Sequence, residues 1–160
     1  MNLSLPIMTK QIEIIKKTRA FLLDTLKDLT TEQYNHIPEG FNNNIIWNLG
    51  HMIAAQQGVC YIRAGLTPIV SEDFINTYKS GTKPEKPLSA EEIENIKSLL
   101  LTTLDQLETD YNNHIFGGYI AWSTRYGVEL ASIDDALNFI PFHEGLHSGC
   151  GTALKRLVTR

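Results

Sequence analysis

The chain has 160 residues, of which 42% are hydrophobic and 20% are charged, a composition typical of one globular domain with a buried core. The formal net charge is -4, and no cluster of Lys and Arg is dense enough to bind a row of phosphates or an anionic membrane. We therefore expect a single domain over residues 1–160 that binds neither nucleic acid nor membranes.

The start of the chain and its cysteines predict a cytoplasmic protein. Pro6 stands where a signal peptide would have its apolar region, and Lys10 follows soon after. No apolar run approaches the roughly 20 residues that a membrane-spanning helix needs. Two cysteines, Cys60 and Cys150, are too few for a disulfide scaffold, so we interpret both as reduced thiols.

Four stretches have apolar residues at helical spacing. The first covers residues 9–29, with apolar side chains on one stripe and lysines on the opposite face. The second covers residues 45–64. It follows three asparagines at 42–44, any of which can cap a helix, and it ends at Gly65.

The third and fourth helices have recognisable starts. Ser89 and Glu92 have the spacing of a capping box, in which two side chains and two backbone amides pair reciprocally. The fourth helix begins near Ser132, where acidic residues follow in the first turn. Its apolar stripe contains two histidines and consists of Ala136, Ile140, His143, His147, Cys150, Leu154 and Val158.

Two connections are long for a compact domain. Residues 65–88 contain three prolines, and residues 111–131 are rich in aromatic side chains. Within the second connection, residues 119–126 are expected to form a short strand or an ordered lid. Together these features predict an all-α fold, a four-helix bundle with two long connecting segments, whose central layer is the usual place for a metal site.

Three of the five histidines are candidate metal ligands. His143 and His147 are four residues apart, so both lie on one face of a helix and can approach one ion. The alternative is two separate core histidines, each of which would need its own hydrogen-bond partner. We expect His36 and His114, in polar surroundings, to be ordinary surface residues.

A third nitrogen is expected from His51, in the middle of the second helix and flanked by small residues. Three neutral imidazoles with open positions suit Zn²⁺, Ni²⁺ or Fe²⁺ in a centre of catalytic type, since structural zinc sites are normally closed by four protein ligands. Pro141 precedes the pair and predicts a kink or a new helix start. Either outcome leaves His143 and His147 in one helical segment.

Residues 143–147 also satisfy the zinc protease pattern H-E-x-x-H, in which the glutamate is the general base. Such a protease needs a third ligand downstream, yet none of the 13 residues after His147 is His, Asp or Glu. The metzincin extension fails as well, because Cys150 and Ala153 occupy its required positions. Glu144 points about 100° away from His143 on a helix, so we expect it beside a ligand or on the surface rather than as a base.

The chain resembles the DinB/YfiT-like superfamily. The resemblance lies in residues 46–51 (IWNLGH) and 142–149 (FHEGLHSG), and the F-x-x-x-Y-x-x-G-T-x-P run at 74–84 is similar to the family's connection between its second and third helices. It implies a four-helix bundle, commonly a homodimer, that binds a divalent metal such as nickel or zinc through His51, His143 and His147. One departure is Cys150, where the family frequently has glutamine; this thiol is a neighbour of the site or a small buried filler.

The resemblance implies metal-dependent chemistry on small molecules. Characterised relatives include S-transferases and isomerases that use low-molecular-weight thiols such as bacillithiol or mycothiol, and some members are described as metal-dependent hydrolases. Both reactions rely on a metal that lowers the pKa of a bound thiol or water. Our first hypothesis is therefore an enzyme whose three-histidine metal activates a thiol or water toward a small electrophile, in a pocket formed by Trp47, Trp122, Tyr126 and Cys150.

The second hypothesis is a stress-response bundle without catalytic activity, a binding or dimerisation module whose metal is structural. A third, DNA binding, is suggested by the family name alone and lacks a basic face. Metal-dependent turnover would distinguish the first hypothesis from the second.

Overall fold

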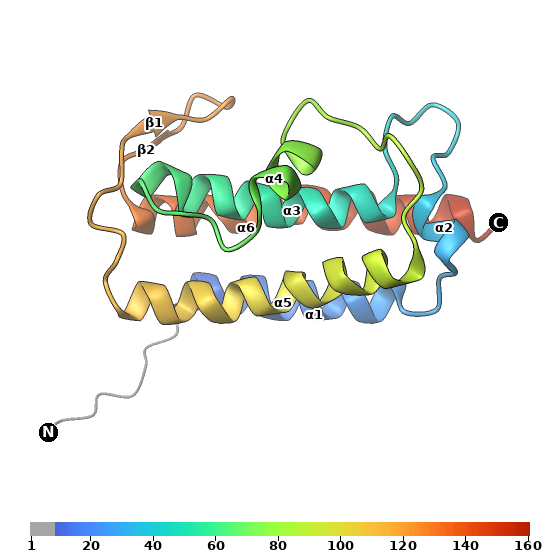
Figure 1. The fold of residues 1–160 in the computed structure, drawn as a ribbon, viewed down its shortest axis with the longest axis horizontal. Coiled ribbons are helices and arrows are strands. Elements are labelled where there is room, and N and C mark those ends of the chain that lie inside the picture. Colours follow the sequence, from blue (N-terminus) through green and yellow to red (C-terminus); the bar gives the residue numbers. More distant parts are fainter. Residues whose placement is uncertain (1–8) are drawn as a thin grey trace, which may run out of the picture.

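Four long helices pack side by side as a bundle in the computed structural model, which describes residues 9–160 (Figure 1). They are α1 (Lys10–Leu26), α3 (Ile45–Cys60), α5 (Ala90–Asn112) and α6 (Ile133–Val158). The predicted all-α four-helix bundle is thus confirmed. Pro6, on which the prediction of no signal peptide rests, lies outside the described residues.

The helix directions explain the first long connection. Helix α1 runs in the same direction as α6, and α3 in the same direction as α5 (Figure 1). Two hydrogen bonds show that α3 and α5 are parallel, from Gln56 to Thr103 and from Tyr61 to Asp110. The residue numbers rise along both helices in the same direction. Two consecutive long helices that run in parallel require the chain to return along the bundle. Residues 61–89 make this return, over the outer side of α3.

Side-chain caps begin each long helix where the sequence predicts. Thr9, Asn44, Ser89 and Ser132 each accept a hydrogen bond from a backbone amide in the first turn, which satisfies donors that the helix itself leaves free. The capping box of Ser89 with Glu92 is also present.

The helix ends and the short helices differ from the prediction. Helix α1 ends at Leu26, and α3 ends at Cys60 before a 3-10 turn, η1 (Ile62–Ala64), that closes at Gly65 with φ 71°. Two short helices were not predicted: α2 (Thr31–Asn35) and α4 (Glu72–Tyr78). They are too short for apolar periodicity to reveal them.

The aromatic connection folds into a small hairpin. Strand β1 (Trp122–Ser123) pairs with the antiparallel β2 (Glu129–Leu130), and Gly127 adopts φ 77° in the turn. The short strand expected within residues 119–126 is therefore present, but it covers only Trp122–Ser123. Helix α6 is continuous through Pro141, so no new helix starts there, and His143 and His147 share one helix as expected.

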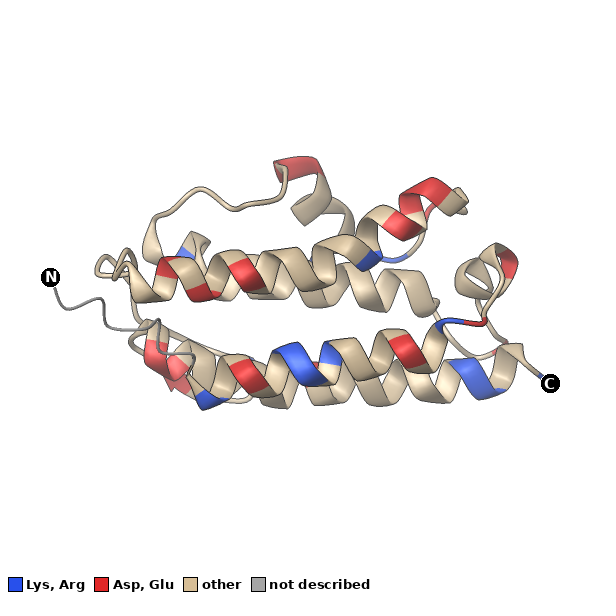
Figure 2. Cartoon of the chain, turned by 90° about the horizontal axis from the view of Figure 1, so that it is seen from below, with Lys and Arg blue, Asp and Glu red and all other residues tan. Residues whose placement is uncertain are grey.

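Apolar side chains from all four long helices fill the interior, including Leu22, Met52, Leu100 and Leu154, each no more than 2% exposed. The outer face of α1 carries both basic and acidic residues, whereas the charged residues of α5 are acidic except for Lys97 (Figure 2). Within residues 9–160, no helix combines the length and apolar character that crossing a membrane requires.

Candidate metal centre

The three candidate ligands meet between α3 and α6. These helices pack against each other in opposite directions, which brings the middle of α3, with His51, opposite the middle of α6, with His143 and His147. The Nε2 atoms of His51 and His143 are 3.3 Å apart. The ring of His147 lies 4.5 Å from that of His51 and 4.6 Å from that of His143. One ligand atom from each histidine lies within 4.8 Å of the others, a spacing that is compatible with a single bound ion.

Hydrogen bonds set the tautomers of two of these histidines. Nδ1 of His51 lies 2.7 Å from the carbonyl oxygen of Tyr78. A carbonyl only accepts, so Nδ1 carries the hydrogen and the lone pair is on Nε2. Nδ1 of His147 lies 2.9 Å from Oδ1 of Asn48, whose amide nitrogen donates to the Asn44 carbonyl at 2.8 Å. His147 therefore also keeps its lone pair on Nε2.

A close approach between α4 and α3 makes the Tyr78 contact available. A Cβ atom at Gly50 would lie 2.5 Å from the Tyr78 ring, so only glycine allows α4 to dock at this distance. Trp47, one turn before His51, stacks on its imidazole with ring centroids 4.9 Å apart and planes 9° apart. Helix α4, which was missed in the sequence, thus orients one of the three ligands.

Burial keeps the three histidines neutral. Burial is the largest cause of the pKa shift of each histidine. It lowers the pKa of His51, lowers that of His143 to about 3, and lowers that of His147 to about 4. The neighbouring imidazoles add to this effect for His143 and His147. Neutral imidazoles with converging lone pairs are the donor set that Zn²⁺, Ni²⁺ and Fe²⁺ accept, so the residues present fit a divalent transition metal.

A buried ion pair that we did not predict involves Glu144, the residue after His143. Nε and Nη2 of Arg19 donate to the two carboxylate oxygens of Glu144 at 2.9 and 2.6 Å, and the side chains are 0% and 2% exposed. Because Glu144 is only 2% exposed, the surface alternative for it is wrong. A carboxylate held in this way is not free to act as the general base of a protease. The signal for Arg19 was its place on the apolar stripe of α1 between Ile15 and Leu22.

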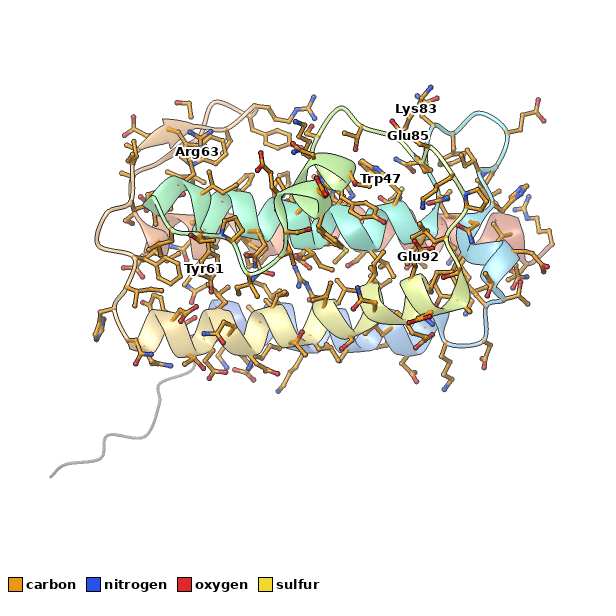
Figure 3. The ribbon with its side chains drawn as sticks, in the orientation of Figure 1. Trp47, Tyr61, Arg63, Lys83, Glu85 and Glu92 are labelled. Atoms are coloured by element: carbon orange, nitrogen blue, oxygen red, sulfur yellow. The ribbon has the colours of Figure 1, made fainter. Side chains whose placement is uncertain are left out.

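The residues predicted to form the substrate pocket do not meet in one place. Trp47 stacks on His51, and Cys150 is half-buried on α6, where burial raises the pKa of its thiol. Trp122 lies near the other end of α3, with the Arg63 guanidinium 4.3 Å above its ring; Arg63 and Trp47 are well separated in Figure 3. Tyr126 packs edge-on against Phe142 at 5.2 Å.

Two cavities are lined by residues that contact the histidines, although none of the three histidines lines either cavity. One, of about 540 Å³, lies under the connection between α4 and α5, and its walls include Trp47, Tyr78 and Lys83 (Figure 3). The other, of about 440 Å³, lies between the hairpin and α6 and is lined by Tyr126, Phe139 and Phe142 among others. Phe139 is one turn before His143, with ring centroids 6.5 Å apart, so one wall residue of this second cavity lies beside the histidine cluster. His36 and His114 are exposed.

The region that contains the three histidines also matches a known protein family. The family profile of the DinB superfamily matches residues 14–150, which include all three histidines. The chain belongs to the DinB superfamily. No match is found among curated proteins. Membership of this superfamily and the three-histidine group are together compatible with binding of a divalent metal ion.

Proposed function

We propose that this DinB superfamily protein is a metal-dependent enzyme, in which His51, His143 and His147 hold Ni²⁺, Zn²⁺ or Fe²⁺. The observation that carries the proposal is the convergence of three neutral imidazoles, two of them with the tautomer set by a hydrogen bond on Nδ1. When bound, such an ion lowers the pKa of a coordinated thiol or water and so supplies a nucleophile at neutral pH. A small electrophilic substrate would receive it, as in thiol transfer or hydrolysis.

The donor set favours a catalytic over a structural centre. Structural zinc sites are closed by four protein ligands, whereas catalytic sites keep a position open for water or substrate. Within the described part of the chain, the potential ligands that come together here are the three histidines. The nearest carboxylate in the sequence, Glu144, is paired with Arg19. The remaining coordination positions are therefore left to small molecules.

The cavity next to the hairpin supports an apolar substrate group. Its wall of Tyr126, Phe139 and Phe142 reaches the turn before His143, and aromatic faces bind apolar and aromatic groups. Glu129 and Asp135 also line this cavity, which disfavours an anion there. We therefore expect substrates with a neutral or cationic apolar group, and a low-molecular-weight thiol or water as the nucleophile.

Metal analysis tests the proposal first. The protein should be purified without a histidine tag, reloaded with Zn²⁺ or Ni²⁺, and analysed by mass spectrometry for bound metal. We expect about one ion per chain, lost in His143→Ala and kept in the exposed-histidine control His36→Ala. A stoichiometry near zero after reloading would refute the proposed centre. Turnover is then measured with thiols plus electrophiles and with esters, in the presence and absence of the metal.

A homodimeric binding module without catalytic activity is the second candidate, and one surface favours it. Helices α1 and α6 pack together and expose large apolar side chains, with Phe21 73% exposed and Phe142 50% exposed. Apolar exposure on adjacent helices is typical of protein interfaces. A dimer by light scattering, no metal-dependent turnover, and a melting temperature that falls on chelation would together favour this candidate.

A further inference from the structure

We propose that Arg19 is a positioning residue for the metal centre, and that its contacts with Glu144 on α6 and Met52 on α3 set the position of α3 along α6. The inference rests on the proposed metal site, since it concerns how the ligands are held. Arg19 contacts none of the three ligating nitrogens, so its effect would be transmitted through the two helices that carry them.

The contacts of the guanidinium place it at the junction of all four long helices. Arg19 extends from α1, and its Nη1 donates to the carbonyl oxygen of Leu100 on α5 at 2.8 Å. Its Nη2 donates to the carbonyl oxygen of Met52 on α3 at 3.2 Å. Nε and Nη2 together hold the Glu144 carboxylate of α6. A longer contact, 3.5 Å from Nη1 to the Thr103 hydroxyl, engages the fifth donor of the guanidinium.

Two of these contacts fall on the immediate neighbours of metal ligands. Met52 follows His51 on α3, and Glu144 follows His143 on α6. A single planar group therefore holds both ligand helices at the level of the ligands. Between α3 and α6 themselves, His51 lies beside His143, and His147 hydrogen-bonds to Asn48.

A purely stabilising role does not account for this arrangement. Removing two charges from water has a large desolvation cost, and apolar side chains of similar size commonly give equal or greater stability. What a bidentate pair adds is direction, because its hydrogen bonds fit only one relative position of the groups. A metal centre needs that precision, since metal-to-ligand distances are defined within about 0.2 Å. Apolar contacts alone allow α3 and α6 small displacements that the ligands do not tolerate.

The test replaces the pair by apolar side chains and measures metal binding separately from folding. In the variant Arg19→Met/Glu144→Leu we expect cooperative unfolding at a temperature close to that of the wild type. Its affinity for Ni²⁺, from competition titration, should be at least tenfold weaker. The visible absorption spectrum of the Co²⁺-loaded protein should also differ, because that spectrum reports ligand geometry rather than stability.

Arg19→Lys is the second variant. It keeps the positive charge on α1 and so tests the inference even if the double variant does not fold. Lysine cannot make the bidentate contact and reach Met52 at the same time, so we expect weaker Ni²⁺ binding and an altered Co²⁺ spectrum here too. Lys16→Met is the matched control. Lys16 lies one turn earlier on α1 and pairs with Asp105 on α5 at 2.8 Å, so its loss should leave metal affinity unchanged.

The outcomes separate this inference from the proposed function. Wild-type protein that binds no metal would refute the proposed function and this inference with it. Wild-type protein that binds metal, with Arg19 variants that match its affinity and Co²⁺ spectrum, would overturn only the positioning role. A Lys16→Met variant that loses affinity as strongly as the Arg19 variants would overturn it as well.

Discussion

Replacing Gly50 by alanine should damage both stability and metal binding, although alanine is the better helix former. The new Cβ would lie 2.5 Å from Cδ1 and 2.7 Å from Cγ of Tyr78, closer than carbon atoms can approach. Tyr78 is 7% exposed, and its ring packs on Phe74 at 4.7 Å, so it cannot move aside freely. Helix α4 must therefore shift away from α3, and the Tyr78 carbonyl with it.

The expected loss of stability follows from three contributions. Overpacking of a buried contact costs about 1–3 kcal/mol, and loss of the hydrogen bond from His51 to Tyr78 costs about 1 kcal/mol. The helix propensity of alanine offsets about 1 kcal/mol. We expect Gly50→Ala to lower the free energy of unfolding by about 1–3 kcal/mol, and the affinity for metal by about tenfold or more, because His51 loses the group that orients it.

Gly58→Ala, in the same helix, is the control. Its added Cβ would have no neighbour within 4 Å, so this variant should gain up to about 1 kcal/mol and bind metal as the wild type does. Urea denaturation followed by circular dichroism measures stability, and competition titration measures metal affinity. Equal stability gains in the two variants, with unchanged metal affinity, would refute the reasoning about the contact between α4 and α3.

Three further predictions concern the histidines and the buried pair. Asn48→Leu removes the acceptor that orients His147 and should weaken metal binding by about 10- to 100-fold, measured by titration. Folded metal-free protein holds the pKa of His143 at about 3 and that of His147 at about 4, whereas the unfolded chain takes up these protons near pH 6.5. Lowering the pH from 7 to 5.5 should therefore reduce the free energy of unfolding by about 1 kcal/mol per histidine. Urea titrations in the presence of a chelator measure this change. A free energy of unfolding that does not change with pH would contradict the neutral state assigned to the two histidines. Arg19→Met alone leaves the Glu144 carboxylate buried without a partner and should lower the free energy of unfolding by about 3–5 kcal/mol. The double variant with Glu144→Leu should be more stable than this single variant, and calorimetry on both measures the difference.

The sequence by itself determined the features that depend on neighbours within a few residues. The caps at Ser89 and Ser132 bond to amides three positions ahead, so their helix starts can be read locally. His143 and His147 lie on one face because a helix repeats every 3.6 residues. The family patterns around His51 and His143 are also local, and they named the three histidines that the structure brings together.

Only the tertiary structure decided which distant groups surround those histidines. The Tyr78 carbonyl reaches His51 across 27 residues of sequence, and Arg19 reaches Glu144 across 125. Trp122, by contrast, packs with Arg63 rather than beside Trp47. No short-range spacing encodes these contacts, because they depend on the direction, displacement and close approach of whole helices. Those quantities come from packing all four helices at once, with Gly50 at the contact of α3 with α4 and Arg19 at its contact with α1.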